Sequence, residues 1–246
     1  MRNRIGIIIQ ARLSSTRLPK KIILDVGNSE SFLDIQLKRL KNLTGDLPII
    51  LATSTSKKDV LLREYSIKYG ISFFQGSEEN VLERFIQCSE AHNLDAIIRI
   101  CSDNPFIDIK SIKELCSIYN NEDYLSFKIN NKPAILTHYG FFCEIVSLSA
   151  LRKVYKKEKK ECLEHVTNCI YSNTNDFNVK FLDKKIENSS VRCTLDTNGD
   201  FENLKNIYFD FVKENHQSGY KDIIKYIESN LELLKSMSKI IKENTK

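Results

Sequence analysis

Residues 5–21, with the sequence IGIIIQARLSSTRLPKK, decide the fold around which the rest of the chain is arranged. Residues 5–9 are β-branched except for Gly6, which is typical of a strand buried on both faces of a sheet. After Gln10 the stretch becomes a loop rich in cationic and hydroxyl side chains. Such donors at the carboxyl end of a buried strand predict a cradle for phosphate groups, because open α/β sheets bind ligands at that edge. The alternative is a surface loop with scattered basic residues.

These residues resemble the opening motif of the cytidylyltransferases that activate sugars, especially the spore-coat-polysaccharide type and its relatives that make CMP-activated acidic sugars. The family pattern is roughly Q-A-R-x-G-S-T-R-L-P-G-K, and the chain departs from it at Ser14 and Lys20, where the family usually has glycine. If either position requires a positive φ, a residue other than glycine costs about 1 kcal/mol there. The resemblance implies that the matched residues bind the nucleotide, with Arg12 and Lys21 in catalytic roles: Gln10, Ala11, Arg12, Ser15, Thr16, Arg17 and Lys21.

Length and composition are those of one globular domain. A chain of 246 residues can form a single α/β domain over residues 1–246 with a substantial core. No apolar run approaches the roughly 18 residues of a transmembrane helix, and the N-terminal apolar run is too short for a signal peptide. The net charge of +5 suits an enzyme that holds an anionic nucleotide, without the basic stripe that nucleic-acid binding requires. We therefore expect a cytoplasmic protein with neither a nucleic-acid nor a membrane partner.

The cysteines and histidines show no metal or disulfide framework. There are seven cysteines, an odd number, and no two form a C-x-x-C pair; the four histidines are dispersed. We therefore expect buried free thiols in a reducing cytoplasm rather than disulfides or a zinc site.

Apolar and amphipathic segments alternate along the first half of the chain. The expected strands are residues 5–9, 47–53, 71–75 and 95–100, and the expected helices are 31–43, 59–69, one that Ser77 caps, and 109–119. Gly70 is expected to end the second helix as its C-cap. Four consecutive strand–helix units with short links predict an α/β fold with a Rossmann-like, mostly parallel sheet and helices on both faces.

The pattern changes between residues 124 and 147, where short strands are expected at 125–129, 135–137 and 141–146. Short strands this rich in apolar side chains either pack on the domain's own core or project to pair with another copy. Family relatives use a comparable β excursion to form dimers, so we expect a two-fold symmetric homodimer with Phe141 and Phe142 at the interface. The rest of the chain is expected to form helices at 149–157 and 161–171, strands at 177–182 and 191–195, and a helical tail over 200–246.

Two further segments resemble family motifs. Residues 99–108, RICSDNPFID, resemble R-I-T-G-D-N-P-F-I-D, with Ser102 in place of glycine, and residues 191–197, VRCTLDT, resemble L-R-W-T-V-D-T. In the family, the aspartates that match Asp103 and Asp196 hold a divalent metal, Mg²⁺ (or Mn²⁺). Mg²⁺ prefers hard oxygen ligands and often binds through one or two carboxylates plus substrate phosphates. From the residues alone, Asp103 before Asn-Pro is a turn former.

Other matched residues have a functional and a structural interpretation. The resemblance places Thr53, Ser77 and Arg84 near the nucleotide, but residues 77–84 also fit an ordinary capped helix with a solvent-exposed arginine. It places substrate binding on Asn104, Glu144 and His165, although a histidine of this kind is also typical of a packed or capping position.

The resemblance implies an enzyme that transfers CMP from CTP to an acidic sugar or a sugar or polyol phosphate, with release of pyrophosphate, for surface polysaccharide or glycan biosynthesis. One alternative is a metal-dependent glycosyltransferase that uses a nucleotide-sugar donor, although the Asp-x-Asp triplet of such enzymes does not occur here. The other is a catalytically inactive nucleotide-binding homologue, for which the altered Ser14, Lys20 and Ser102 are the only sign.

Overall fold

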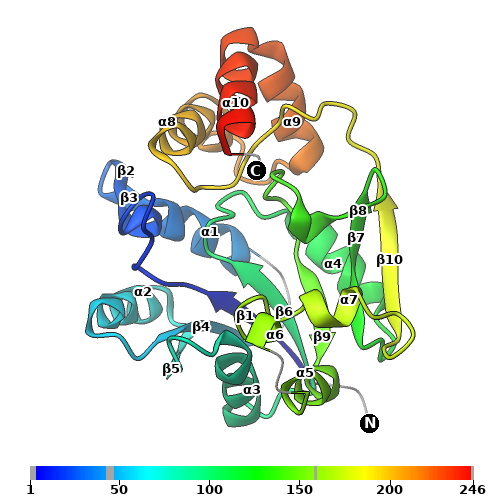
Figure 1. Cartoon of the computed structure of the whole chain (residues 1–246). Coiled ribbons are helices and arrows are strands. Elements are labelled where there is room, and N and C mark those ends of the chain that lie inside the picture. The colour runs from blue at the N-terminus through cyan, green and yellow to red at the C-terminus, as the bar shows by residue number, and fades with distance from the viewer. Residues whose placement is uncertain (1–3, 43–46, 158–159, 245–246) are drawn as a thin grey trace.

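The computed structural model describes residues 4–42, 47–157 and 160–244. Its central sheet has the strand order β10-β7-β9-β6-β1-β4-β5, with β8 paired to β7 (Figure 1). These strands are β1 (Ile5–Gln10), β4 (Ile49–Ser54), β5 (Ser72–Gly76), β6 (Ala96–Cys101), β7 (Tyr124–Ile129), β8 (Lys132–Pro133), β9 (Glu144–Ser147) and β10 (Val179–Lys184). A separate two-stranded ribbon joins β2 (Asp25–Gly27) to β3 (Glu30–Ser31).

The β1 strand lies at the centre of the parallel part of the sheet. It pairs in parallel with β4 on one side and with β6 on the other, and β4 pairs in parallel with β5. The chain therefore moves outward from β1 through β4 to β5 and then returns to the opposite side of β1 as β6. Such a reversal opens a crevice beyond the carboxyl ends of the two strands, where doubly wound sheets bind ligands. The expected Rossmann-like, mostly parallel sheet is confirmed.

Both faces of the sheet are buried. Successive side chains of a strand point to opposite faces, so neighbouring residues of β1 belong to different cores. Ile7 and Ile9 belong to one apolar core and Ile8 to another. The first core lies under α1 (Phe32–Lys41), α2 (Leu62–Tyr69), α4 (Ile109–Ile118), α8 (Asn198–Ile207), α9 (Tyr220–Ser229) and α10 (Leu231–Asn244). The second lies under α3 (Val81–Ala91), α5 (Leu148–Tyr155), α6 (Lys160–Glu164) and α7 (Asn168–Tyr171). Figure 1 shows α8, α9 and α10 gathered at one end of the molecule and α3 and α5 at the other.

Helix caps agree with the sequence at one predicted position and differ at another. Gly70 ends α2 with a φ of 59°, as expected for a C-cap. Asn80 rather than Ser77 caps α3, because its side chain accepts a hydrogen bond from the backbone N–H of Glu83 at 3.0 Å. The hydroxyl of Ser77 instead accepts from the backbone N–H of Asn80, in the turn that follows β5.

Several expected elements of the second half are different in the structure. Residues 134–136 form a 3-10 helix rather than a strand, and two short helices, α6 and α7, replace one helix over 161–171. Residues 191–195 are extended but pair with no strand among the described residues. The expected helical tail is interrupted before α9, whose N-cap is Gly219.

The β excursion over 124–147 lies within the main sheet, since β7 and β9 pair with each other and β9 pairs with β6. Phe141, Phe142 and Ile145 are buried against the chain's own core. These rings therefore do not project toward a second copy, and an interface built on Phe141 and Phe142 does not fit the structure. The homodimer itself stays a prediction.

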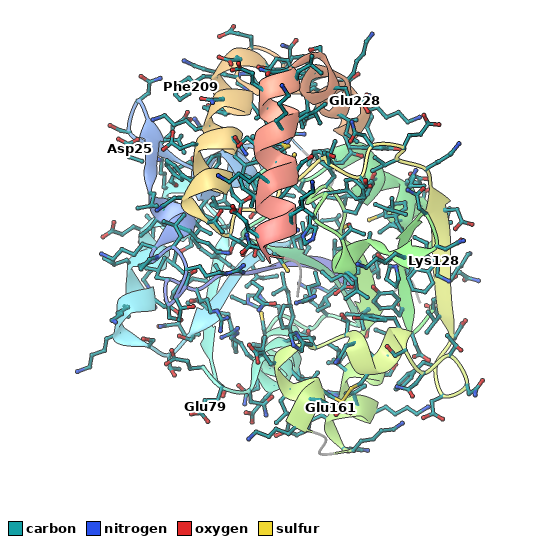
Figure 2. The ribbon with its side chains drawn as sticks, turned by 45° about the horizontal axis from the view of Figure 1, so that its top comes forward. Asp25, Glu79, Lys128, Glu161, Phe209 and Glu228 are labelled. Atoms are coloured by element: carbon teal, nitrogen blue, oxygen red, sulfur yellow. A yellow bond between two sulfur atoms is a disulfide. The ribbon has the colours of Figure 1, made fainter. Side chains whose placement is uncertain are left out.

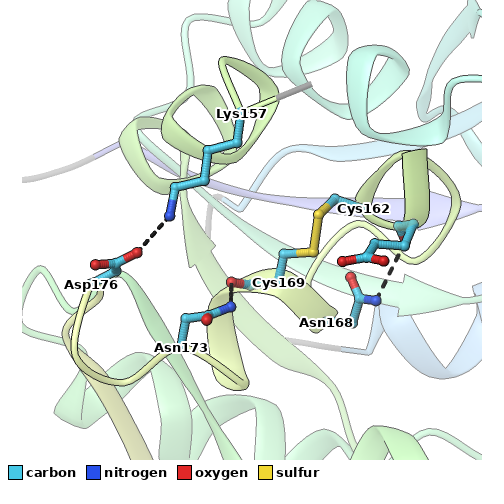
Figure 3. The surroundings of a disulfide bond; sticks show 7 residues. Lys157, Cys162, Asn168, Cys169, Asn173 and Asp176 are labelled. Carbon is cyan, nitrogen blue, oxygen red and sulfur yellow. Dashed lines mark hydrogen bonds and ion pairs between the residues drawn. A yellow bond between two sulfur atoms is a disulfide. The ribbon is translucent and has the colours of Figure 1, made fainter. Parts of the chain in front are cut away.

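The expectation that all cysteines are free is wrong for one pair. Cys162 of α6 and Cys169 of α7 form a disulfide with a Cα–Cα distance of 5.7 Å, whereas the other five cysteines are free (Figure 3). The sequence spacing did not indicate this bond, because the bend between the two short helices brings the sulfurs together. The segment that contains Glu161 lies at the opposite end of the molecule from Phe209 and Glu228 (Figure 2).

None of the helices within the described ranges has the length and apolar character that spanning a bilayer requires.

Candidate active site

Three segments converge beyond the carboxyl ends of β1 and β6. The loop over residues 11–21 follows β1, and the backbone N–H of Ser102, just after β6, donates to the carbonyl oxygen of Gln10 at 3.0 Å. The extended segment 191–196 reaches the same place, because Leu195 N–H donates to the carbonyl oxygen of Asp103 at 2.9 Å. All three motif segments named from the sequence therefore meet at the crevice between β1 and β6.

Two aspartates and a lysine form the centre of this site. Lys21 Nζ lies 3.3 Å from Asp103 Oδ2 and 3.0 Å from Asp196 Oδ1, and Arg17 contacts the same Asp196 oxygen at 2.9 Å. Burial raises the pKa of Asp196, but the positive charges of Lys21, Arg17 and Arg192 together lower it by more. The net pKa is therefore below its ordinary value. Asp196 is therefore a carboxylate at neutral pH.

The donor set fits a hard divalent cation. The carboxylates of Asp103 and Asp196 come from different segments and both contact one ammonium group, that of Lys21. Their oxygens therefore face a common point, beside a hollow that would admit phosphate and water ligands. Mg²⁺ and Mn²⁺ take oxygen ligands of this kind.

A hollow of about 430 Å³ lies on the loop side of the two aspartates. Its lining contains the cationic and hydroxyl residues that the sequence predicted together: Gln10, Arg12, Ser15, Thr16, Arg17, Lys21 and Asp103, with Ser14 and Ser102. Ala11 is buried and donates its backbone N–H to the carbonyl oxygen of Ala52, so its contribution is to the loop's shape. The loop that was predicted to bind phosphate therefore lines a concavity with three cationic side chains and the two aspartates, while phosphate binding itself stays a prediction.

The positions where the family usually has glycine differ in backbone conformation. Lys20 has a φ of 57°, in the left-handed region, whereas Ser14 and Ser102 lie outside that region. The side chain of Lys20 is exposed and does not line the hollow. A non-glycine residue at Lys20 therefore costs about 1 kcal/mol, and serine is tolerated at the other two positions.

A second hollow, of about 210 Å³, lies on the far side of the same aspartates. It shares Cys101, Asp103 and Asp196 with the first hollow, and its other walls include Asn104, Thr137, His138, Gly140, Phe142 and Thr194. Asn104 therefore lines this hollow, and its role in substrate binding stays a prediction.

Glu144 has a structural role and not the substrate contact that the resemblance implied. It is buried, accepts from Arg99 NH1 at 2.7 Å and Tyr124 Oη at 2.5 Å, and also accepts from Thr167 Oγ1 at 2.9 Å. The same Arg99 donates to Gln10 Oε1 at 2.9 Å. Glu144 thus fixes Arg99, which in turn orients Gln10 at the edge of the first hollow.

Thr53 is also wrongly assigned to direct nucleotide contact. Its side chain is buried and donates to Asp59 Oδ2 at 2.9 Å, while Ser54 donates to the same oxygen at 2.6 Å. The other oxygen of Asp59 accepts from the backbone N–H of Leu13 at 2.8 Å. Thr53 and Asp59 therefore anchor the cationic loop from below.

Arg84 is a buried residue rather than a solvent-exposed one. Its NH1 donates to the carbonyl oxygen of Ser77 at 3.0 Å, whereas its Nε and NH2 have no hydrogen-bond partner among the described residues. Burial lowers the pKa of this guanidinium, only partly offset by Asp59. Buried donors without partners are costly, and Arg84 lines neither of the two hollows.

His165 is not brought into the site. It is exposed on the bend between α6 and α7 and lines neither hollow. Its neighbour Thr167, in contrast, is buried and bonded to Glu144, so this matched segment supports the site through Thr167.

Sequence reasoning missed Arg192 and His138. Arg192 is buried, donates to Asp200 at 2.6 Å and 3.0 Å and to Asp196 at 3.1 Å, and lies 2.7 Å from His138 Nδ1 through its NH1. The spacing of Thr197 and Asp200 was an available signal, because T-x-x-D is a capping box and places a carboxylate directly behind Asp196.

The sequence model of the family described as cytidylyltransferase matches residues 6–239. The chain is 33% identical over 214 residues to spore coat polysaccharide biosynthesis protein SpsF of Bacillus subtilis, covering 84% of this chain and 87% of that protein. A solved cytidylyltransferase from Leptospira borgpetersenii superposes with a TM-score of 0.83 at 28% identity, covering 95% of this chain and 97% of that chain.

A more distant solved structure shares the fold alone. It is CMP:2-keto-3-deoxy-manno-octonic acid synthetase complexed with CTP, with a TM-score of 0.61 and 13% identity over 84% of this chain and 99% of that one. The family match, by contrast, extends over nearly the whole sequence, and the relative in Bacillus subtilis passes 30% identity over most of both chains. The chain belongs to the cytidylyltransferase family.

Proposed function

We propose that this nucleotidyltransferase transfers CMP from CTP to an acidic sugar or a sugar or polyol phosphate, with release of pyrophosphate. One observation carries the proposal: Asp103 and Asp196 converge on Lys21 between a cationic hollow and a second hollow whose described lining has no lysine or arginine. A donor nucleotide and an acceptor can thus approach the same two carboxylates from opposite sides.

The cationic hollow suits the triphosphate. Arg12 and Arg17 offer guanidinium donors and Lys21 offers an ammonium group, and charge-assisted hydrogen bonds to phosphate oxygens are strong. These side chains would hold the β- and γ-phosphates while the acceptor oxygen attacks the α-phosphorus in line. Pyrophosphate then leaves on the side of the cations that already hold it.

Asp103 and Asp196 would hold a Mg²⁺ or Mn²⁺ ion, which would offset charge on the phosphate oxygens when bound. The pKa of Asp196, lowered by Lys21, Arg17 and Arg192 against the effect of burial, keeps this ligand ionised across the neutral range. Arg192 fixes the same carboxylate through Asp196 Oδ2, on the side away from Lys21.

Arg84 suits the base. Its Nε and NH2 are buried without partners, and its NH1 is held by Ser77. Cytosine carries a carbonyl oxygen and a ring nitrogen that accept hydrogen bonds, which would satisfy these donors. Asp59 would support this end of the site because it fixes both the loop and β4.

The test is pyrophosphate release from CTP with Mg²⁺ and a panel of acceptors: N-acetylneuraminate, 2-keto-3-deoxy-manno-octonate and ribitol phosphate. Mass spectrometry of the product should show the acceptor with CMP attached. Absence of pyrophosphate release with every acceptor, while CTP still binds, would support the inactive nucleotide-binding homologue. Transfer of a sugar from a nucleotide-sugar donor would support the glycosyltransferase.

A further inference from the structure

The lining of the second hollow includes two polar residues that have no role in the proposed function. His138, from the segment after the 3-10 helix, lines it, and so does Thr194, whose hydroxyl oxygen is buried and has no hydrogen-bond partner within the described ranges. Among the described residues that line this hollow, none is lysine or arginine. Its negative charge comes from Asp103 and Asp196, at the edge that it shares with the cationic hollow.

The orientation of the His138 ring is fixed by Arg192. NH1 of Arg192 lies 2.7 Å from His138 Nδ1, and a guanidinium group can only donate hydrogen bonds. Nδ1 therefore accepts this hydrogen bond, and a neutral ring carries its proton on Nε2. Burial, together with the charges of Arg192 and Lys132, lowers the pKa of His138, which agrees with a neutral ring.

The partners of Arg192 make this arrangement rigid. Both oxygens of Asp200 accept from it, and Asp200 is itself fixed at the N-terminus of α8 by Thr197. The main chain is fixed as well, because Cys193 N–H donates to the carbonyl oxygen of His138 at 2.9 Å. Gly140, with a φ of 68°, allows this close approach, since a Cβ there would lie 2.5 Å from the carbonyl oxygen of Cys193.

We propose that the second hollow binds the uncharged, hydroxyl-bearing part of the acceptor, and that His138 donates its Nε2–H to one of those hydroxyl oxygens. This rests on the proposed function, which it deepens. A carboxylate or phosphate of the acceptor would lie at the shared edge, where Lys21 and a metal ion offset its charge. Deeper in the hollow an anion would have no cationic partner on the lining, whereas hydroxyl groups would have the donor of His138 and the free hydroxyl of Thr194.

His138 is by this argument an acceptor-binding residue and not a general base. Its Nδ1 is occupied by Arg192 and its Nε2 already carries the proton, so neither nitrogen is free to take a proton from the attacking oxygen. The rate should therefore depend on His138 through the KM of the acceptor, with kcat little changed.

Two substitutions at His138 separate its hydrogen-bond donor, Nε2–H, from its other contact, in which Nδ1 accepts from Arg192. In His138→Asn, the side-chain oxygen can still accept from Arg192, but no donor reaches the position of Nε2. In His138→Gln, an amide N–H reaches the position of Nε2. We expect His138→Asn to raise the acceptor KM about tenfold, the loss for one neutral hydrogen bond, and His138→Gln to restore most of it. Calorimetric Kd values for CTP should match the wild type in both, and thermal unfolding should match it in His138→Asn, which keeps the acceptor for Arg192.

The acceptors are N-acetylneuraminate, 2-keto-3-deoxy-manno-octonate and ribitol phosphate, measured by pyrophosphate release and, with CTP present, by saturation-transfer NMR. The NMR measurement reads binding without turnover. If the wild type binds one of the three compounds without reacting, the proposed function fails and the loss of binding in His138→Asn still tests the hollow.

Three results would overturn the inference. An unchanged acceptor KM in an active His138→Asn variant would show that His138 does not donate a hydrogen bond to the acceptor. A large fall in kcat at unchanged KM would make His138 an acid or base. Nitrogen-15 spectra of the histidine rings that show Nδ1 protonated at pH 7 would contradict the donor assignment.

Discussion

Leu195 donates its backbone N–H to the carbonyl oxygen of Asp103 at 2.9 Å. This bond joins the segment before α8 to the turn after β6, and it places Asp196 beside Asp103. No side chain takes part in this bond, so the main chain at the two aspartates stays joined when either carboxylate is replaced. Substitution of either carboxylate should therefore leave their surroundings in place.

Arg12→Ala and Lys21→Ala should each lower kcat/KM for CTP by about 10²-fold or more. That is the scale of losing a charge-assisted contact worth roughly 3 kcal/mol to a phosphate. Steady-state pyrophosphate release checks both variants. Lys20→Gly is the matched control, because Lys20 is a neighbouring cation outside the hollow with a φ of 57°. It should keep wild-type kinetics and gain up to about 1 kcal/mol of unfolding free energy. A larger kinetic effect at Lys20 than at Lys21 would contradict the assignment of the loop.

Arg84→Met should weaken CTP binding while leaving the free protein about as stable as the wild type. The guanidinium has two buried nitrogens without partners, so its removal relieves a desolvation cost and loses one hydrogen bond to Ser77. We expect the unfolding free energy in urea to stay within about 1 kcal/mol and the calorimetric Kd for CTP to rise at least tenfold. A strongly destabilised variant with unchanged CTP affinity would make Arg84 purely structural.

The thiol count tests the disulfide. Under denaturing, non-reducing conditions a thiol reagent should titrate five free cysteines, and all seven after reduction. Cys162→Ser releases Cys169 and should give six titratable thiols without reduction, that is five plus one. Seven thiols in the untreated, oxidised wild type would show that Cys162 and Cys169 are not bonded.

The homodimer prediction now rests on the exposed side of the β excursion. Leu136 is 47% exposed, whereas Phe142 is 7% exposed. If the chain dimerises through this region, Leu136→Glu should convert a dimer into a folded monomer in light scattering at micromolar concentration. Phe142→Glu should unfold the chain instead, because it buries a charge. A wild-type monomer at that concentration would end the prediction, and a dimer that survives Leu136→Glu would place the interface elsewhere.

The main architecture and the convergence of the motifs could be predicted because both depend on local signals. The apolar run at the start of β1 and the polar residues that follow it place the loop at a sheet edge. The same holds for Asp103 after β6. In a parallel sheet these edges coincide, so motif order along the chain was enough to predict their proximity.

The direction of individual side chains could not be predicted in the same way. Glu144 and Thr53 belong to strands whose ends approach the site, yet both side chains point into the protein, toward Arg99 and Asp59. Arg39 of α1 is a charged residue yet is buried, where it donates to the carbonyl oxygens of Ile107, His216 and Ser218. In each case the deciding partner lies outside the local pattern, and only the tertiary structure brings it into contact.

The central claim is that Asp103 and Asp196 together hold the metal ion for CMP transfer. Its most direct test is the rate of pyrophosphate release from CTP in the presence of an acceptor that the wild type uses. The rate is measured as Mg²⁺ is titrated into the wild type, Asp103→Asn and Asp196→Asn. We expect the wild type to lose activity in excess chelator and regain it with Mg²⁺. Each variant should retain its fold by circular dichroism and lose most turnover at every Mg²⁺ concentration, because each lacks one anionic ligand. Full activity in either variant, or in the wild type with excess chelator, would contradict the claim.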